Sequence, residues 1–290
     1  MSHAGRYGSI MALMVDRRSP RVSDWGVALR DAARSVEPVV LTSSQIELFF
    51  EQGFVVVDQM TSPEEVSVLR AGYDRLFHER AGEIDGLYTE ASSDGSTVGT
   101  VAFPKIHKIF DLVPELRWSG FAANAARVAT QLFGKKVRFL GGRAMMKPPM
   151  CPQHTPWHQD PAYHSPDRIY RNVNIWLSLQ DCPLDAGAMQ FVPRSHHGSV
   201  VLPHRRPGDR PDSNGLELAD LSAVTEVVGC PLRAGGATLH HSYVLHQTPP
   251  NTTAAPRRAL IAVFAAPPAR RKGHLCLPWQ EYAPPSDPGY

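Results

Sequence analysis

The sequence predicts a mainly β domain in which helices pack on an antiparallel sandwich or barrel. Two observations support this fold class: helical patterns fill the first half of the chain, and short strand patterns separated by turn residues fill the second half. A length of 290 residues and a hydrophobic content of 42% suit one large domain with a sizeable core. The formal net charge of +2 gives no electrostatic reason to expect a nucleic-acid partner.

The domain boundary is placed where regular patterns begin. Residues 1–40 are predicted to form an irregular N-terminal leader, and residues 41–290 a single domain. The domain opens with a short helix that Ser43 or Ser44 can cap and that Gly53 ends.

Two longer helices and a series of strands are predicted next. Ser62 is the expected N-cap of a helix with Pro63 in its first turn, and a further helix spans roughly residues 114–133. The strand patterns are "FVVVD", "KVRFLGGRAMMKPP", "NVNIWLSLQD", "GAMQFVP", "GATLHHSYVLH" and "RRALIAVFAA". Two long segments with little periodicity, residues 81–103 and 199–228, interrupt these elements.

Cysteine usage and hydropathy indicate the compartment. The four cysteines lie far apart and form no CxxC pair, which fits a reducing, cytoplasmic environment and argues against a zinc ribbon. No stretch approaches 18 apolar residues, so neither a transmembrane helix nor a membrane partner is expected.

The most informative stretch is "HTPWHQDPAY", which begins at His154. His158 and Asp160 are two residues apart, so on an extended segment both side chains point the same way. Such a pair can bind a metal ion if at least one further ligand joins it. The alternative is a polar surface turn in which the aspartate accepts a hydrogen bond from a backbone amide.

The stretch "GGATLHHSYVLHQTPPNTTAAPRRALIAVF" offers the third ligand. His246 is expected at the end of one strand and Arg257 at the start of the next. His240 and His241 compete with it, because His240 shares the strand face of His246 if the strand is continuous. The "PPN" turn and the spacing to Arg257 favour His246. Alternation lets only one member of the Arg257–Arg258 pair face inward.

Two neutral imidazoles and one carboxylate on one face of a divalent metal form the ligand set of non-heme Fe(II) oxygenases. Such a set leaves three coordination positions, which a chelating 2-oxo acid and dioxygen can fill. An arginine beyond the metal can bind the far carboxylate of that acid through two parallel hydrogen bonds. The chemistry of His158, Asp160, His246 and Arg257 fits this scheme.

In these residues the chain resembles the phytanoyl-CoA dioxygenase family of Fe(II)/2-oxoglutarate oxygenases. The matching segments are "LTSSQIELFFEQGFVVVD", "SPEEVSVLR", "WHQD", "NVNIWLSLQD", "GAMQFVPRSHH" and "LHQTPPNTTAAPRRAL", which run from about residue 41 to 266. The resemblance implies a double-stranded β-helix, a cupin-like jelly-roll barrel with flanking helices.

The resemblance also implies roles for individual residues. His158, Asp160 and His246 would bind Fe(II), and Arg257 would bind the far carboxylate of the cosubstrate 2-oxoglutarate. The positions that match the rest of the family's cosubstrate pocket are Gln159, Thr248, Trp176 and Lys105, with Lys108 as the alternative to Lys105.

Contacts to the substrate are expected near the ligand segments and on the barrel rim. The candidates are Tyr163, His164, Arg143 and Tyr243, each of which could instead be a packing residue or a surface charge. The segments 81–103 and 199–228 are candidate lids over the site.

The implied activity is oxidation of an unactivated carbon of a small molecule, by hydroxylation, with O2 consumed and succinate and CO2 released. Asp160 favours oxygen transfer, because relatives that halogenate carry a small residue at this position. We expect a tailoring enzyme of natural-product biosynthesis, with an acyl-CoA hydroxylase of the same family as the alternative. The rivals from other classes are a zinc-dependent hydrolase or isomerase on a cupin-like barrel and a non-catalytic binding protein.

Overall fold

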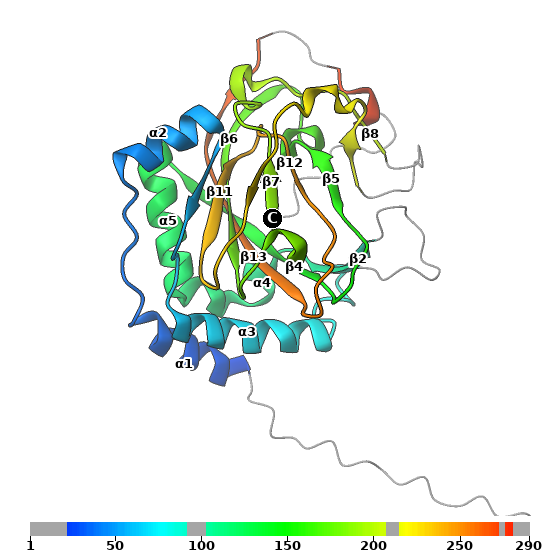
Figure 1. The fold of residues 1–290 in the computed structure, drawn as a ribbon. Helices are drawn as coiled ribbons and strands as arrows, with labels where there is room; N and C mark the ends of the chain where they lie inside the picture. The colour runs from blue at the N-terminus through cyan, green and yellow to red at the C-terminus, as the bar shows by residue number, and fades with distance from the viewer. Residues whose placement is uncertain (1–21, 92–102, 207–214, 273–275, 281–290) are drawn as a thin grey trace, which may run out of the picture.

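The computed structural model describes residues 22–91, 103–206, 215–272 and 276–280, and Figure 1 shows its arrangement. Its α-helices are α1 (Val22–Ala33), α2 (Ser43–Gln52), α3 (Pro63–His78), α4 (Ile109–Leu112) and α5 (Gly120–Phe133). Its strands are β1 (Phe54–Val57), β2 (Tyr88–Ala91), β3 (Phe103–Ile106), β4 (Arg138–Lys147), β5 (Thr155–His158), β6 (Arg168–Ser178), β7 (Met189–Phe191), β8 (His204–Arg205), β9 (Glu217–Leu218), β10 (Val228–Cys230), β11 (Ala237–His241), β12 (His246–Thr248) and β13 (Arg257–Arg270).

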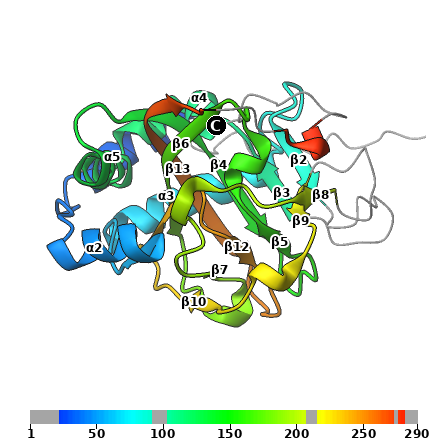
Figure 2. The same cartoon turned by 90° about the horizontal axis from the view of Figure 1, so that it is seen from above.

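Two antiparallel sheets form the body of the domain. The larger sheet has the strand order β1-β11-β6-β13-β4-β3-β2, and the smaller has the order β10-β7-β12-β5. Strands β8 and β9 form a separate two-stranded ribbon. Figure 2, which looks down on the view of Figure 1, shows helices α2 and α5 on one side of the molecule and the short strands β7, β10 and β12 on another. The predicted helices on an antiparallel β-sandwich are confirmed.

The larger sheet has two different faces because its side chains alternate. On β6, Val173, Ile175 and Leu177 belong to the core that also contains residues of α2, α3 and α5. The intervening Asn174 and Trp176 point the other way, toward the inside of the barrel, where Trp176 packs with residues of β7 and β13. The sheet thus carries an apolar face for the helices and a mixed face for the interior.

The helix caps are close to the prediction. Thr42, rather than Ser43 or Ser44, caps α2, because its side chain accepts from the Gln45 amide while the Gln45 side chain accepts from the Thr42 amide. Gly53 ends this helix with a left-handed backbone (φ 89°), as expected.

The predicted helix over residues 114–133 is two elements. A short 3-10 helix covers Pro114–Trp118, and α5 begins at Gly120. Ser119 separates them because its backbone is extended (φ −69°, ψ 149°) and its hydroxyl accepts from the Ala122 amide as an N-cap.

Part of the expected irregular leader is regular. Within residues 1–40, Val22–Ala33 form helix α1, which packs against α3. Leu29 is fully buried, and the Trp25 indole donates to the Val68 carbonyl at 3.0 Å. Residues 1–21 lie outside the described residues.

The two candidate lids contain short strands. Strands β2 and β3 lie in or at the edge of segment 81–103, and β8 and β9 lie in segment 199–228. Residues 92–102 and 207–214 are outside the described residues, so closure over a site stays a prediction.

A buried carboxylate joins two helices beside the larger sheet. Glu65 of α3 is fully buried and accepts from the amides of Gly120 and Phe121 at 2.6 and 2.8 Å, and also from the Thr61 hydroxyl. The carboxylate therefore occupies the N-terminus of α5, where unpaired amides and the helix dipole favour negative charge.

We expect Glu65→Gln to destabilise the fold by about 2 kcal/mol, because the neutral amide offers one acceptor oxygen in place of two to this donor set. Urea unfolding measures the change. The control is Glu64→Gln on the same helix, whose side chain is exposed and whose effect should stay within about 0.5 kcal/mol. Equal effects of the two variants would contradict this role for Glu65.

Candidate active site

The "HQD" segment ends a strand and stays extended for one more residue. His158 is the last residue of β5, and Gln159 keeps extended angles (φ −121°, ψ 133°) before Asp160 begins a 3-10 helix. The side chains of His158 and Asp160 therefore point to the same side, as predicted. Both are buried.

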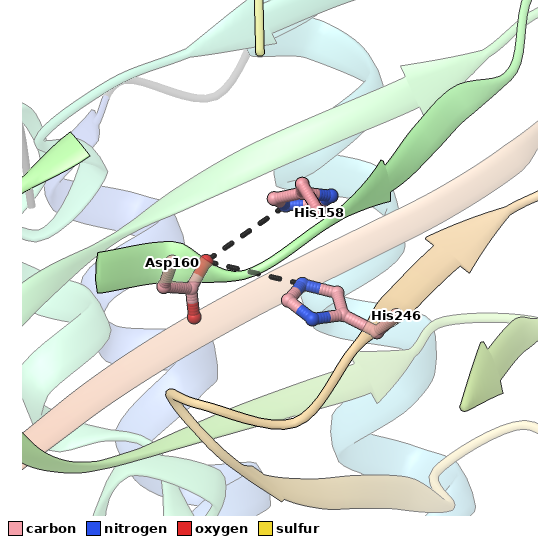
Figure 3. Close-up of side chains that lie close together, drawn as sticks. All are labelled: His158, Asp160 and His246. Atoms are coloured by element: carbon pink, nitrogen blue, oxygen red, sulfur yellow. Dashed lines mark ion pairs between the residues drawn. The ribbon is translucent and has the colours of Figure 1, made fainter. Parts of the chain in front are cut away.

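Strand pairing brings the third residue to this pair. His246 begins β12 and lies opposite His158 of β5 in the antiparallel register, and the two imidazole centroids are 4.2 Å apart. The Asp160 Oδ1 atom lies 3.9 Å from His158 Nε2 and 3.8 Å from His246 Nε2. Figure 3 shows the three side chains converging from two segments of the chain.

Hydrogen bonds to backbone carbonyls fix the orientation of both imidazoles. The Nδ1 atom of His158 lies 2.8 Å from the Pro156 carbonyl, and that of His246 lies 2.9 Å from the Val244 carbonyl. A carbonyl can only accept, so Nδ1 carries the proton and donates it. Each Nε2 then presents its lone pair toward Asp160, which is the tautomer that a metal ligand requires.

The protonation states also suit a divalent cation. Burial, with a smaller effect of His246, lowers the pKa of His158 to about 3, so this imidazole is neutral at neutral pH. Burial raises the pKa of Asp160, but the electrostatic effects of the neighbouring His246 and Arg143 outweigh this and hold the pKa below its usual range. The ligand atoms of the triad lie within 4.8 Å of one another. Two imidazole nitrogens and one carboxylate oxygen fit a first-row transition metal.

His240 is not part of this group. The strand that contains it, β11, ends at His241, and a turn separates it from β12, so the expected continuous strand over these residues is wrong. His246 consequently begins a strand instead of ending one. The ring of His240 packs 4.7 Å from that of His246, as a neighbour of the triad.

Arg257 is a buried cation that forms no ion pair with an acidic side chain of the described residues. It begins β13, is 1% exposed, and its Nη1 lies 3.4 Å from the Met145 carbonyl. Its Nε and Nη2 atoms have no hydrogen-bond partner among the described residues, although burial of unpaired donors is costly. Arg258 points to the other side and forms an ion pair with Asp74. The prediction that Arg257 is the inward member of the pair is confirmed.

One predicted cosubstrate residue, Trp176, lies beside Arg257, and a second, Thr248, follows the triad residue His246 on β12. The Trp176 ring centroid is 5.3 Å from the guanidinium carbon of Arg257. Thr248 is buried on β12, two residues after His246, and its hydroxyl has no partner among the described residues. The Arg257 guanidinium and the Thr248 hydroxyl thus both have buried atoms without a hydrogen-bond partner in the described structure.

Two further basic residues, Lys105 and Arg143, lie close enough to Arg257 or Asp160 to affect a pKa there. Lys105 on β3 has its pKa lowered to about 8 by burial and by the charges of Arg143 and Arg257. Lys108, the alternative, is exposed at the start of α4. Arg143 on β4 lowers the pKa of both Lys105 and Asp160, so it lies on the side of the barrel that holds both.

Lys147 is a buried basic residue that sequence reasoning missed. Its Nζ donates to the carbonyls of Thr248 and Pro249, the first at 2.9 Å, and so holds the backbone that carries the Thr248 hydroxyl. Burial lowers its pKa to about 6. Its place before the proline pair of "KPP" gives no signal of this contact, which depends on strands more than 100 residues apart.

Gln159 does not point into the site. Its side chain is fully buried and makes three hydrogen bonds to backbone groups, donating to the carbonyls of Val200 and Tyr243 and accepting from the Leu202 amide. This arrangement does not fit the expectation that Gln159 lines the cosubstrate pocket. It follows from alternation, because the residue between two inward side chains must face outward.

The predicted substrate residues are dispersed. The Tyr163 ring lies 6.2 Å from that of His158, with its hydroxyl accepting from the Leu216 amide. The His164 ring packs on Tyr170, and the Tyr243 hydroxyl accepts from Arg271. Of these aromatic candidates, Tyr163 is the one that contacts a triad side chain.

A direct test of the triad is metal binding. We expect the protein to bind one divalent cation, and Asp160→Ala or His246→Ala to weaken that binding at least about tenfold, because each variant removes one of three ligands. Calorimetric titration with Co(II) measures the affinity. His154→Ala is the control, since His154 is exposed and four residues before His158. Unchanged affinity in both triad variants would place the metal elsewhere.

Comparison with known proteins agrees with this geometry. The chain is 28% identical to an ectoine dioxygenase of Nocardia farcinica over 242 residues, which are 77% of this chain and 77% of the relative. It is 23% identical to phytanoyl-CoA dioxygenase domain-containing protein 1 of Danio rerio over 260 residues, covering 75% and 88% of the two chains.

Solved structures share the two-sheet architecture. EvdO2 from Micromonospora carbonacea var. aurantiaca, complexed with 2-oxoglutarate, superposes with a TM-score of 0.70 at 30% identity, covering 84% of this chain and 98% of that one. The epimerase SnoN, in complex with Fe3+, alpha ketoglutarate and nogalamycin RO, gives a TM-score of 0.61 at 25% identity, with coverages of 79% and 85%. The predicted double-stranded β-helix is confirmed.

Among the helices of the described residues, none has the length and hydropathy that a membrane span needs.

The family description "Phytanoyl-CoA dioxygenase (PhyH)" matches residues 49–259, a span that contains the whole triad and Arg257. This chain therefore belongs to the phytanoyl-CoA dioxygenase family and is an Fe(II)/2-oxoglutarate-dependent dioxygenase.

Proposed function

We propose that this dioxygenase hydroxylates an unactivated carbon of a small molecule in a tailoring step of natural-product biosynthesis. The observation that carries the proposal is the buried guanidinium of Arg257, whose Nε and Nη2 have no hydrogen-bond partner among the described residues, together with the buried triad of His158, Asp160 and His246. Similarity to EvdO2, which binds 2-oxoglutarate, and to SnoN, whose complex contains nogalamycin RO, supports it.

We assign the three triad side chains as iron ligands. His158 and His246 would each hold the metal through Nε2, since Nδ1 donates to a backbone carbonyl in both. Asp160 would supply the one negative charge, and its lowered pKa keeps it ionised at neutral pH. Iron bound here supplies the oxidising power of the reaction together with 2-oxoglutarate and dioxygen, and succinate and carbon dioxide leave.

Arg257, Thr248 and Lys105 would bind the cosubstrate. The guanidinium and the Thr248 hydroxyl offer unpaired donors, which a carboxylate satisfies with charge-assisted hydrogen bonds. Trp176 packs beside the guanidinium and keeps water from its face. The protein's part is thus to orient one dianion, whose charge the buried cations attract, and to exclude water from it.

Hydroxylation is proposed over halogenation because the carboxylate ligand is present. A zinc hydrolase on the same barrel gives no reason to bury an unpaired arginine at 1% exposure. We propose that Arg143 and Tyr163 line the substrate side, since Arg143 lies on the side of the barrel that holds Asp160 and the Tyr163 ring meets that of His158.

Anaerobic addition of Fe(II) and 2-oxoglutarate should give the weak visible charge-transfer band of the chelate. We expect Arg257→Ala to need about 30-fold more 2-oxoglutarate for half of that band, which corresponds to about 2 kcal/mol for a buried charged hydrogen bond. Arg258→Ala is the matched control, because its side chain bonds to Asp74 outside the barrel, and it should stay within about twofold. No band in the metal-loaded wild type would refute the oxygenase assignment.

Binding of 2-oxoglutarate should also weaken as the pH rises through the pKa of Lys105, about 8. The ammonium is present below this pKa and lost above it, so affinity for the dianion falls between pH 7 and pH 9, by at most about tenfold for one group. Lys147 does not titrate in this window, since its pKa is about 6. Calorimetry measures the affinity, and Lys105→Met should flatten the profile. The same slope in Lys105→Met would exclude Lys105 as the group that titrates.

A further inference from the structure

The two oxygens of the Asp160 carboxylate have different surroundings. Oδ1 faces the Nε2 atoms of His158 and His246 at 3.9 and 3.8 Å. Oδ2 accepts a hydrogen bond from the Asn174 side-chain amide, Nδ2, at 2.7 Å. One oxygen is therefore turned toward the two imidazoles, and the other is engaged by a neutral donor.

Asn174 lies in the middle of the larger sheet. It is on β6, between β11 and β13, where its cross-strand neighbours are His240 and Val263. Its side chain is fully buried, and its Oδ1 atom has no hydrogen-bond partner among the described residues. An asparagine with an unpaired buried oxygen is costly at a strand centre, where apolar residues pack well. In the described structure, the Asn174 side chain donates its hydrogen bond to Asp160.

The chemical nature of the donor is informative. An asparagine amide donates without carrying charge, so the carboxylate keeps its full negative charge for a cation. A lysine or arginine in its place would form an ion pair and offset that charge. The donor also comes from the opposite sheet to that of β5, so it fixes the carboxylate relative to the barrel as a whole.

Resting on the proposed function, we propose that Asn174 is a positioning residue that reserves Oδ1 of Asp160 as the single carboxylate oxygen offered to iron. Engaging Oδ2 disfavours use of both carboxylate oxygens as ligands. One protein oxygen and two imidazoles then leave three positions, which a chelating 2-oxo acid and dioxygen require. Loss of the amide frees the carboxylate to rotate and removes part of the preorganisation of the triad.

The test compares two inward asparagines of the same strand. Asn174→Leu keeps the branched shape of the side chain and Asn174→Ala leaves space, and both remove the donor. Asn172→Leu and Asn172→Ala are the matched controls, because Asn172 is also buried on β6 and no hydrogen bond joins its side chain to Asp160 in the described structure. Each variant is titrated with Co(II) alone by calorimetry, its visible Co(II) spectrum is recorded, and its thermal unfolding is measured.

We expect both Asn174 variants to lower Co(II) affinity about 10- to 100-fold and to change the intensity of the cobalt bands, because outer contacts of a metal ligand act on this scale. The Asn172 variants should stay within about twofold. If Asn174→Leu fails to fold, Asn174→Ala decides the result.

Folded Asn174 variants with the affinity and spectrum of the wild type would overturn the positioning role and leave the iron-site assignment intact. Equal losses in the Asn172 variants would also overturn it, because the effect would then come from the strand in general. A wild-type protein whose Co(II) binding does not depend on Asp160 would overturn the proposed function instead, and this inference with it.

Discussion

The antiparallel pairing of β5 with β12 is the contact on which the rest of the site depends. It sets His246 opposite His158, and Asp160 follows two residues later on the same side. Because side chains alternate along a strand, a slip of β5 by one residue would turn the side chains of His158 and Asp160 away from the interior. The Gln159 side chain, bonded to three backbone groups of two neighbouring segments, opposes such a slip.

Two buried basic side chains in the barrel, Lys147 and Arg257, differ in their hydrogen-bond partners. Lys147 is satisfied by two carbonyls and supports the chain after β12. Arg257, which lies opposite Lys147 in the β4–β13 pairing, has two unpaired donor atoms in the described structure. Burial makes an unpaired cation costly, so an anion bound to Arg257 would offset part of that cost. The same barrel thus contains a basic group that supports the backbone and a buried cation with unpaired donor atoms.

The larger sheet supports both the fold and the site through its two faces. Its apolar face meets the helices, where Glu65 ties α3 to α5, and its mixed face holds Trp176 and Asn174 near the site. A rigid support of this kind suits a metal centre, because ligand positions must be held to within a fraction of an ångström. The short strands of the smaller sheet then need to supply only the ligands themselves.

Local sequence determined the elements and the inward face of each ligand strand. Caps such as Ser62 and Gly53, and the alternation that lets only one of Arg257 and Arg258 face inward, depend on neighbours a few residues apart. It also predicted the His158–Asp160 pair and, with the family resemblance, His246. The tertiary structure shows why His246 and not His240 joins the pair, since a turn separates the two histidines and His246 is the one that pairs with β5. The tertiary structure also revealed the contacts of Lys147 and Asn174. These contacts join segments that are separated in the sequence, so no local pattern encodes them.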